Sequence, residues 1–208
     1  PYDILHLNDW QTGMIPMFLE KGIFGRGRGG QEKTLFTIHN LAYQGVYPAI
    51  GLYETNLPGN FIDQYPTLEY YGKMNFLKAG ISGSDLVNTV SPSYAEEICT
   101  PEFGCGLEGV LSHLNQPAVG IINGVDTKTW NPETDPTLVK NYQKKSLVGK
   151  EACKKALVEE AGLSYNKEIP LFVLISRLVD QKGISIIGEA IEKIMSQPLQ
   201  FILLGSGQ

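Results

Sequence analysis

Two basic residues, Arg177 and Lys182, lie five positions apart, after an apolar run and just before Gly183, where a helix is expected to begin. Arginine offers a fork of N–H donors and lysine a compact charge, so a pair that converges at a helix start suits a diphosphate. The same spacing also fits a solvated turn that holds no ligand. The pair is therefore a candidate phosphate site, with the solvated turn as the alternative.

A second candidate phosphate contact is Gly205-Ser206-Gly207, which follows the apolar run 201–204. A glycine turn between a strand and a helix can present backbone N–H groups to a phosphate. A tight strand-to-helix turn explains the two glycines equally well. By contrast, the G-x-G-x-x-G pattern at 25–30 follows an expected helix and precedes an expected strand. That order is wrong for a dinucleotide fingerprint, and the segment predicts a loop.

Polar side chains recur directly after the apolar runs, among them Asp9, His39, Asn40 and Asn123. In open α/β sheets the ligand site lies outside the carboxyl ends of the strands. These residues therefore predict chemistry at one edge of a sheet, although any strand can end in polar turn residues. His39 is either part of such a site or a buried histidine whose ring is satisfied by the backbone.

Several other kinds of site lack their residues. The sequence has no G-x-S-x-G nucleophile elbow, no H-E-x-x-H pair and no recognisable carboxylate cluster, so neither a serine hydrolase nor a metal site is predicted, and no cofactor is expected. The cysteines Cys99, Cys105 and Cys153 contain no C-x-x-C pair. A disulfide framework or zinc site is therefore not expected, and a reducing compartment is the simpler interpretation.

The elements that must position these residues alternate along the chain. Apolar runs predict strands, each buried on both faces, at 4–7, 35–38, 86–90, 119–122, 171–175 and 201–204. Helical spacing and helix-start signals predict helices at 12–21, 70–81, 92–98, 151–161 and 184–194. This alternation predicts parallel sheets of the doubly wound α/β class. We expect two such sheets, with the boundary between them near residues 117–135.

Composition and charge restrict the class of protein further. The chain has 208 residues, 42% of them hydrophobic, and a net charge of −5. Nucleic-acid binding needs clustered cations, so no nucleic-acid partner is expected. No apolar run approaches the ~20 residues of a membrane helix, so no membrane span is expected. Because the sequence begins at Pro1 without a methionine and stops just after a strand, at Gln208, we expect it to be an excerpt of a longer protein.

Several segments together make the sequence similar to a known family. The most specific is the stretch TIHNLAYQG at 37–45, and another is HLNDWQTG at 6–13. Further segments lie at 75–80, 89–95, 106–109, 122–126, 130–132, 176–178 and 181–183. They follow the family order and span almost the whole chain. On these motifs the chain resembles bacterial glycogen synthases and plant starch synthases.

The resemblance implies a fold of two Rossmann-like domains that face each other across a cleft, the GT-B architecture. Residues 1–122 would be the C-terminal part of the N-terminal, acceptor-side domain. Residues 123–208 would be the first part of the C-terminal, donor domain. Both domains would then be incomplete, since the family's Lys-Thr-Gly-Gly loop and its paired glutamates do not occur in the sequence. We therefore expect the isolated chain to be inactive.

The resemblance also implies an activity and roles for particular residues. The family transfers glucose from ADP-glucose to the non-reducing end of an α-1,4-glucan, with retention and without a required metal. His39 would contact the transferred glucose, and Arg177 and Lys182 would bind the donor phosphates and stabilise the leaving diphosphate. The remaining contacts would be Asp9, Asn40 and Asn123 in the sugar pocket, Gln181 beside it, and Gly205 and Gly207 at the nucleotide.

Three alternatives to this function stay open. A related GT-B transferase could use another donor or acceptor. A glucan-binding relative without catalysis is a second possibility, which the presence of His39, Arg177 and Lys182 disfavours. A nicotinamide oxidoreductase is the third, disfavoured because the complete glycine fingerprint at 25–30 is misplaced. The family implies a cytoplasmic protein if the source is bacterial, and a plastid protein if the source is a plant or alga.

Overall fold

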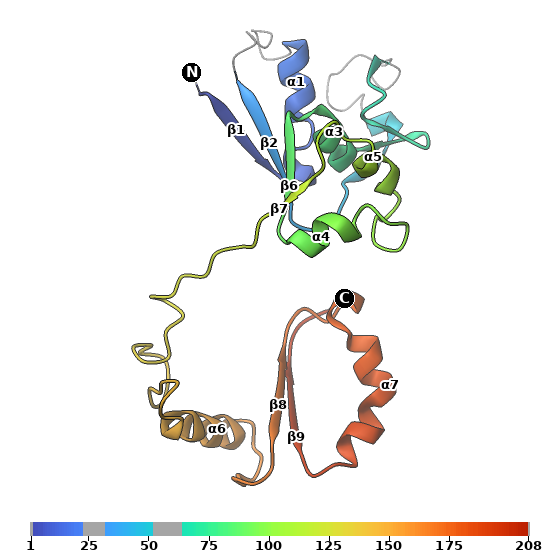
Figure 1. Cartoon of the computed structure of the whole chain (residues 1–208). Coiled ribbons are helices and arrows are strands. Elements are labelled where there is room, and N and C mark those ends of the chain that lie inside the picture. Colours follow the sequence, from blue (N-terminus) through green and yellow to red (C-terminus); the bar gives the residue numbers. More distant parts are fainter. Residues whose placement is uncertain (1, 23–31, 52–63, 208) are drawn as a thin grey trace. The chain divides into compact units, whose positions relative to one another are not determined.

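The computed structural model describes residues 2–22, 32–51 and 64–207. The glycine-rich segment 25–30, for which a loop is expected, lies outside these residues, as do residues 52–63. The chain divides into two compact units, unit 1 (Pro1–Gly124) and unit 2 (Val125–Gln208). Each unit is a separate layered arrangement of helices and strands (Figure 1).

Unit 1 is built on a parallel sheet. Its strands are β1 (Ile4–Asn8), β2 (Lys33–Ile38), β6 (Leu86–Thr89) and β7 (Val119–Gly120), hydrogen-bonded in the order β1-β2-β6-β7. Every pairing in this sheet is parallel. The expected strands and their parallel arrangement are therefore confirmed, although β7 is shorter than the run 119–122. All four carboxyl ends consequently lie at the same edge of the sheet.

The helices of unit 1 connect these strands. They are the short 3-10 helix η1 (Trp10–Thr12) and the helices α1 (Ile15–Lys21), α3 (Phe76–Gly83), α4 (Pro92–Glu97) and α5 (Glu108–Ser112). Helix α4 begins as the sequence predicts, because the Ser91 hydroxyl accepts a hydrogen bond from the Tyr94 N–H and proline occupies the first turn. Helix α1 starts three residues later than expected, because η1 takes up Thr12.

The expected helix at 70–81 is wrong in its first half. The segment instead holds strands β4 (Glu69–Tyr70) and β5 (Lys73–Asn75), and β5 also pairs with β3 (Val46–Pro48). The reason lies in the two residues between the strands, since Tyr71 has a φ of 50° and Gly72 a φ of 75°. Two consecutive positive φ values make a tight hairpin turn, which a helix cannot accommodate.

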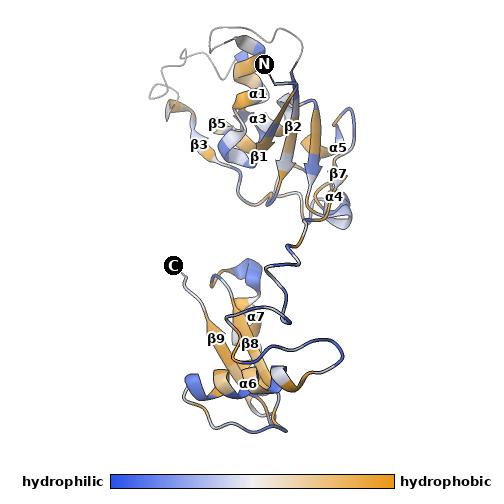
Figure 2. Cartoon of the chain, turned by 90° about the vertical axis from the view of Figure 1, so that its left-hand side faces the viewer, coloured by the Kyte–Doolittle hydropathy of each residue, from blue (hydrophilic) through white to orange (hydrophobic). Residues whose placement is uncertain are grey.

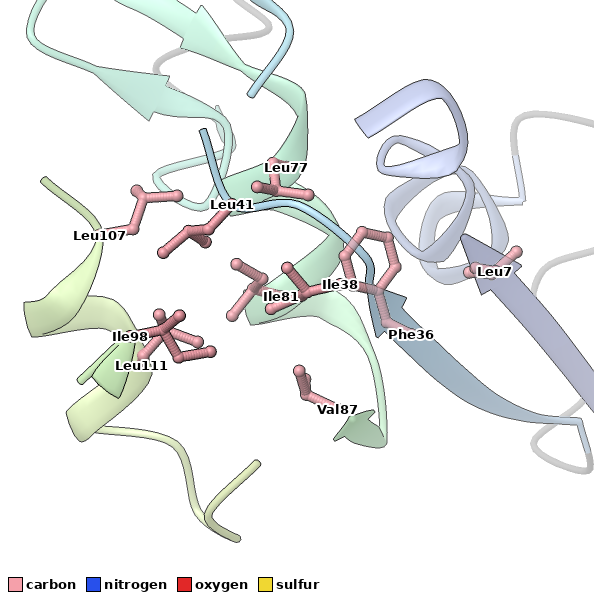
Figure 3. Close-up of a cluster of buried hydrophobic side chains, with 10 residues drawn as sticks. All are labelled: Leu7, Phe36, Ile38, Leu41, Leu77, Ile81, Val87, Ile98, Leu107 and Leu111. Atoms are coloured by element: carbon pink, nitrogen blue, oxygen red, sulfur yellow. The ribbon is translucent and has the colours of Figure 1, made fainter. Parts of the chain in front are cut away.

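One apolar cluster fills the space between the sheet of unit 1 and its helices (Figure 3). Its fully buried members include Phe36 and Ile38 from β2 and Leu77 and Ile81 from α3. Helix α3 can approach β2 closely because residue 80 is glycine. A Cβ there would lie 2.3 Å from a carbon of the Phe36 ring. The cluster thereby fixes β2, whose carboxyl end carries His39.

Unit 2 is a smaller α/β arrangement. It contains α6 (Val148–Glu160), β8 (Leu171–Ile175), the 3-10 helix η3 (Asp180–Lys182), α7 (Ile184–Met195) and β9 (Gln200–Leu204). Strands β8 and β9 are parallel, with α7 as their crossover, and α6 and α7 lie on opposite sides of the pair (Figures 1 and 2). The expected βαβ alternation is therefore confirmed in this unit.

Burial of β8 and β9 on both faces is not observed. Phe172 is 53% exposed and Ile175 is 70% exposed, and Figure 2 shows the strands as apolar ribbons. Within the described part of unit 2 this sheet has two strands, so each strand is hydrogen-bonded to a neighbour on one side only. No helix within the described residues is long and apolar enough to cross a membrane.

Candidate functional site

Two predicted site residues of unit 1, Asp9 and His39, meet at the carboxyl edge of the sheet. Asp9 follows β1 and His39 follows β2, its neighbour in the sheet. The Asp9 carboxylate oxygen Oδ1 accepts a hydrogen bond from the His39 backbone N–H at 2.8 Å. The loop after β2 is therefore held directly by the loop after β1.

The backbone of Asp9 has an unusual conformation. Its φ is 54° and its ψ is −176°, a region that residues with a Cβ rarely adopt. The conformation is kept by neighbouring hydrogen bonds, because the Asp9 N–H donates to the Thr37 carbonyl at 3.0 Å and the Asp9 carbonyl accepts from the Thr12 N–H at 3.2 Å. Such strain tends to persist where it serves a site.

The side chain of His39 is exposed, so the alternative of a buried histidine satisfied by the backbone is wrong. The ring nitrogen Nε2 instead lies 2.9 Å from the side-chain oxygen Oδ1 of Asn8. An amide oxygen can only accept, so in this contact Nε2 carries the proton and donates. In the tautomer of the neutral imidazole that makes this contact, Nδ1 is the acceptor.

The residues after His39 are also held in place. Asn40 is half-buried, and its Oδ1 accepts the Ala42 N–H at 3.1 Å, which closes a small turn. The Leu41 N–H donates to the Tyr94 hydroxyl oxygen at 3.1 Å. Burial raises the pKa of the Tyr94 hydroxyl, so this group stays neutral at physiological pH.

Asn123 lies apart from these contacts. It follows β7 in an exposed segment without regular secondary structure, two residues after Ile121, whose N–H donates to the Thr89 carbonyl at 2.8 Å. Strand β7 is the outermost strand of the same parallel sheet. Asn123 therefore follows the carboxyl end of β7, on the side of the sheet where Asp9 and His39 follow β1 and β2. The described structure records no hydrogen bond that joins it to either residue.

An aromatic pocket adjoins this edge, and sequence reasoning missed it. It has a volume of about 550 Å³ and is lined by Trp10, Ala42, Tyr43, Gln44, Gly45, Val46, Tyr47 and Cys105. The rings of Trp10 and Tyr47 lie 5.9 Å apart. Gly45 has a φ of 61°, and a Cβ there would lie 2.4 Å from an indole carbon of Trp10. The pocket could have been suspected because an aromatic residue directly follows Asp9 after the first strand, and another follows Asn40 three residues later after the second.

A polar ladder under the edge was also missed. The Thr37 hydroxyl donates to Asn88 Oδ1 at 2.5 Å, and His6 Nε2 lies 2.7 Å from the same hydroxyl oxygen. Thr37 and Asn88 are register partners on β2 and β6, and both are buried. The ladder ties three strands together just below His39. Buried polar networks of this kind specify register, since a slipped strand would leave their groups unpaired.

In unit 2, the candidate phosphate residues gather at the carboxyl end of β8 and β9. Arg177 follows β8, and Gln181 and Lys182 lie in η3; all three side chains are exposed. Gly183 has a φ of 71° and is followed directly by α7, so the expected helix start is confirmed. Among the described residues, no group of three or more histidine, cysteine, aspartate or glutamate side chains could hold a metal ion.

The glycines Gly205 and Gly207 have a visible structural reason. The Leu178 N–H donates to the Ser206 carbonyl at 2.9 Å, so the two segments continue side by side beyond the ends of β8 and β9. A Cβ at Gly205 would lie 2.2 Å from the Ser176 carbonyl oxygen, and one at Gly207 would lie 2.8 Å from the Leu178 carbonyl oxygen. The glycines therefore permit close approach to the segment that carries Arg177.

Residues 1–113 match the family described as "Starch synthase catalytic domain". A glycogen synthase of Opitutus terrae is 43% identical over 206 residues, which are 99% of this chain and 43% of that protein. Glycogen synthase 2 of Geobacter sulfurreducens is 44% identical over 206 residues, 99% of this chain and 42% of that protein.

A solved structure is similar as well. The catalytic domain of starch synthase IV from Arabidopsis thaliana, bound to ADP and acarbose, matches with a TM-score of 0.86 and 37% identity. The match covers 99% of this chain and 42% of that one. The chain thus spans less than half the length of these relatives.

Proposed function

The chain belongs to the starch synthase catalytic-domain family, and we propose that it is part of a retaining glucosyltransferase that moves glucose from ADP-glucose to the non-reducing end of an α-1,4-glucan. Residues 1–122 contribute the acceptor side and residues 123–208 the donor side. The relatives span more than twice this length, so the activity is proposed for a whole protein that carries this sequence.

One observation carries the proposal: polar residues that can bind hydroxyl groups lie next to an aromatic pocket in unit 1. Trp10 and Tyr43 line the pocket. Asp9 directly precedes Trp10, and Asn40 lies three residues before Tyr43. A sugar offers hydroxyl groups around its rim and C–H groups on its faces. Apolar and aromatic walls with a few placed polar groups bind such a ligand. The pocket therefore suits the glucan acceptor.

The reacting sugar is assigned to the polar edge. His39 contacts the transferred glucose, with Nδ1 available as an acceptor because Nε2 donates to Asn8. Asp9, Asn40 and Asn123 line the same sugar pocket. In the transfer, the bond between the anomeric carbon and the phosphate oxygen of ADP-glucose breaks, and a bond from that carbon to the acceptor hydroxyl oxygen forms. The proton of the acceptor hydroxyl passes to solvent, and ADP departs with an added negative charge.

The leaving charge is assigned to unit 2. Arg177 and Lys182 are exposed cations at the end of β8 and in η3, and they stabilise the departing diphosphate. Gln181 lies in the same 3-10 turn and contacts the sugar, and Gly205 and Gly207 leave room for the nucleotide. Groups placed to stabilise charge that develops in the transition state often supply the largest catalytic effect. The relatives reported above come from bacteria and from the plant Arabidopsis thaliana, so the proposed location is cytoplasmic if the source is bacterial and plastid if it is a plant or alga.

The test uses Arg177→Ala and Lys182→Ala in the full-length protein. Each should lower kcat by about 10²- to 10³-fold, with a much smaller effect on glucan affinity. Lys193→Ala is the matched control, because it removes an exposed cation from the last turn of α7 in the same unit. Equal losses of kcat and glucan affinity would refute the leaving-group role. Initial rates with ADP-glucose and UDP-glucose test the donor.

A binding module without catalysis is the competing function. It predicts glucan affinity by calorimetry without any affinity for ADP-glucose. The transferase predicts heat of binding for both ligands, and loss of the ADP-glucose signal alone in Lys182→Ala.

A further inference from the structure

We propose that Asn8 is a positioning residue that holds the His39 ring in one orientation before substrate binds. The inference rests on the proposed function, since it explains how an exposed histidine can be ready to contact the transferred glucose. Asn8 is the last residue of β1 and directly precedes Asp9.

The first support is the direct contact. Asn8 Oδ1 lies 2.9 Å from His39 Nε2, within the range of a good hydrogen bond. Both side chains are exposed, so packing alone does not hold the ring. An exposed side chain without such a contact samples several rotamers, and fixing one of them on binding costs free energy. The contact with Asn8 removes part of that cost in advance.

The second support is the way in which two consecutive residues reach the same partner. Asn8 binds the ring of His39, and Asp9 binds its backbone N–H. In an extended strand, successive side chains point to opposite faces of the sheet, so two consecutive side chains cannot both contact the same residue. The φ of 54° at Asp9 breaks this alternation at the point where β1 ends. The strained backbone thus turns both side chains toward His39.

The third support is that Asn8 is itself fixed by the sheet. It is the register partner of Thr37 on β2, two residues before His39. Its carbonyl oxygen accepts the Thr12 hydroxyl at 2.9 Å, which ties it to η1. A contact made from a strand end is more precise than one made from a free loop. Asn8, which holds the His39 ring, is therefore itself fixed by the sheet and by η1.

The decisive variant is Asn8→Leu, which keeps a side chain of similar size and removes the acceptor. In the full-length protein with isotope-labelled histidine, three-bond NMR couplings should show one χ1 rotamer for His39 in the wild type and averaged rotamers in Asn8→Leu. Asn8→Asp keeps an acceptor oxygen and should restore a single rotamer. Asn8→Ser is too short to reach the ring and should repeat the averaging with a polar side chain.

Asn115→Leu is the matched control, an exposed asparagine in the loop before β7 with no recorded hydrogen bond. It should leave the His39 couplings unchanged. If Asn8→Leu and Asn8→Ser also leave them unchanged, the positioning role is refuted, whatever the protein catalyses. This measurement needs no substrate, so its failure is distinct from failure of the proposed function.

In the full-length protein, Asn8→Leu should lower kcat about tenfold and change the KM for glucan little, because misplacing a contact to the reacting sugar acts on the transition state. Asn8→Asp should recover much of this loss. If the His39 rotamer averages and kcat stays at the wild-type value, the role of His39 at the reacting sugar is overturned. Loss of kcat with an unaveraged rotamer overturns the positioning role instead.

Discussion

The backbone strain at Asp9 predicts an inverted order of stability for two substitutions. At an ordinary position in a helix or strand, a protein with alanine is more stable toward unfolding than one with glycine by about 0.5–1 kcal/mol, because glycine loses more chain entropy on folding. Asp9 has a φ of 54°, where a Cβ is unfavourable and glycine is not. We therefore expect Asp9→Gly to be more stable than Asp9→Ala.

The magnitude follows from three contributions. Both variants lose the hydrogen bond from the His39 N–H to the carboxylate, worth about 1 kcal/mol at an exposed position. Glycine relieves about 2 kcal/mol of backbone strain, and its added chain entropy in the unfolded state costs about 0.5–1 kcal/mol. Asp9→Gly should thus remain within about 1 kcal/mol of the wild type, and Asp9→Ala should be about 1–1.5 kcal/mol less stable than Asp9→Gly.

The assay is urea unfolding of the 208-residue chain followed by tryptophan fluorescence. The chain has two tryptophans, Trp10 in unit 1 and the exposed Trp130 in unit 2. A Trp130→Phe background therefore confines the signal to unit 1. Trp10 packs against the apolar cluster of unit 1, so its fluorescence reports unfolding of that core.

The matched control is the same pair of substitutions at Ser82, an exposed residue of α3. There Ala should be more stable than Gly by about 1 kcal/mol, the ordinary helix order. If Asp9→Ala proves more stable than Asp9→Gly, as at Ser82, the strain at Asp9 is absent. The account of how two neighbouring side chains reach His39 would then fail with it.

Three further predictions follow from other contacts. Gly45→Ala should destabilise unit 1 by about 3 kcal/mol in urea unfolding, because a new Cβ would lie 2.4 Å from an indole carbon at a φ of 61°. In unit 2, the pKa of the Tyr165 hydroxyl is raised, chiefly because it donates a hydrogen bond to the Glu151 carboxylate. The stabilisation of the folded state that this hydrogen bond provides is present below the ordinary tyrosine pKa of about 10, and it is lost as pH rises through the higher pKa of the folded state. The urea midpoint should therefore fall above about pH 10 in the wild type, and Tyr165→Phe should flatten that fall. Asn123 is exposed and followed by Gly124, where a Cβ would meet nothing within 4 Å, so the Gly124 nitrogen can attack the Asn123 amide carbon, expel ammonia and form a succinimide. Mass spectrometry after mildly alkaline incubation should detect deamidation there first, and far more slowly in Gly124→Val.

Much of the fold could be predicted because its strands are short apolar runs between polar turns. The runs at 4–7, 35–38 and 171–175 lie within or coincide with β1, β2 and β8. The helix prediction for 70–81 is wrong in its first half for a physical reason. Tyr70, Met74 and Leu77 recur at helical spacing, but Tyr70 and Met74 belong to a hairpin. The turn at Tyr71-Gly72 overrides that spacing locally, and periodicity does not detect it.

The site was predictable in its place and less so in its contacts. The rule that ligand sites lie at the carboxyl ends of strands brought Asp9 and His39 to one edge, where the structure joins them by a hydrogen bond. The contact between Asn8 and His39 depends on a positive φ at an aspartate, which sequence patterns do not reveal. The roles of these residues toward a sugar stay predictions.

The glycines of unit 2 illustrate how one motif can position another that lies far away in sequence. The sequence predicts that Gly205 and Gly207 leave room for a nucleotide. The contacts in the structure show that they also allow two backbone segments to approach each other closely. Without Cβ atoms at these positions, the segment after β9 approaches Ser176 and Leu178, and the Leu178 N–H can donate to the Ser206 carbonyl. Arg177 lies between those two residues, so its backbone is held from both sides by the extension of β9. A methyl group at Gly205 would therefore displace Arg177, even if it touched no nucleotide.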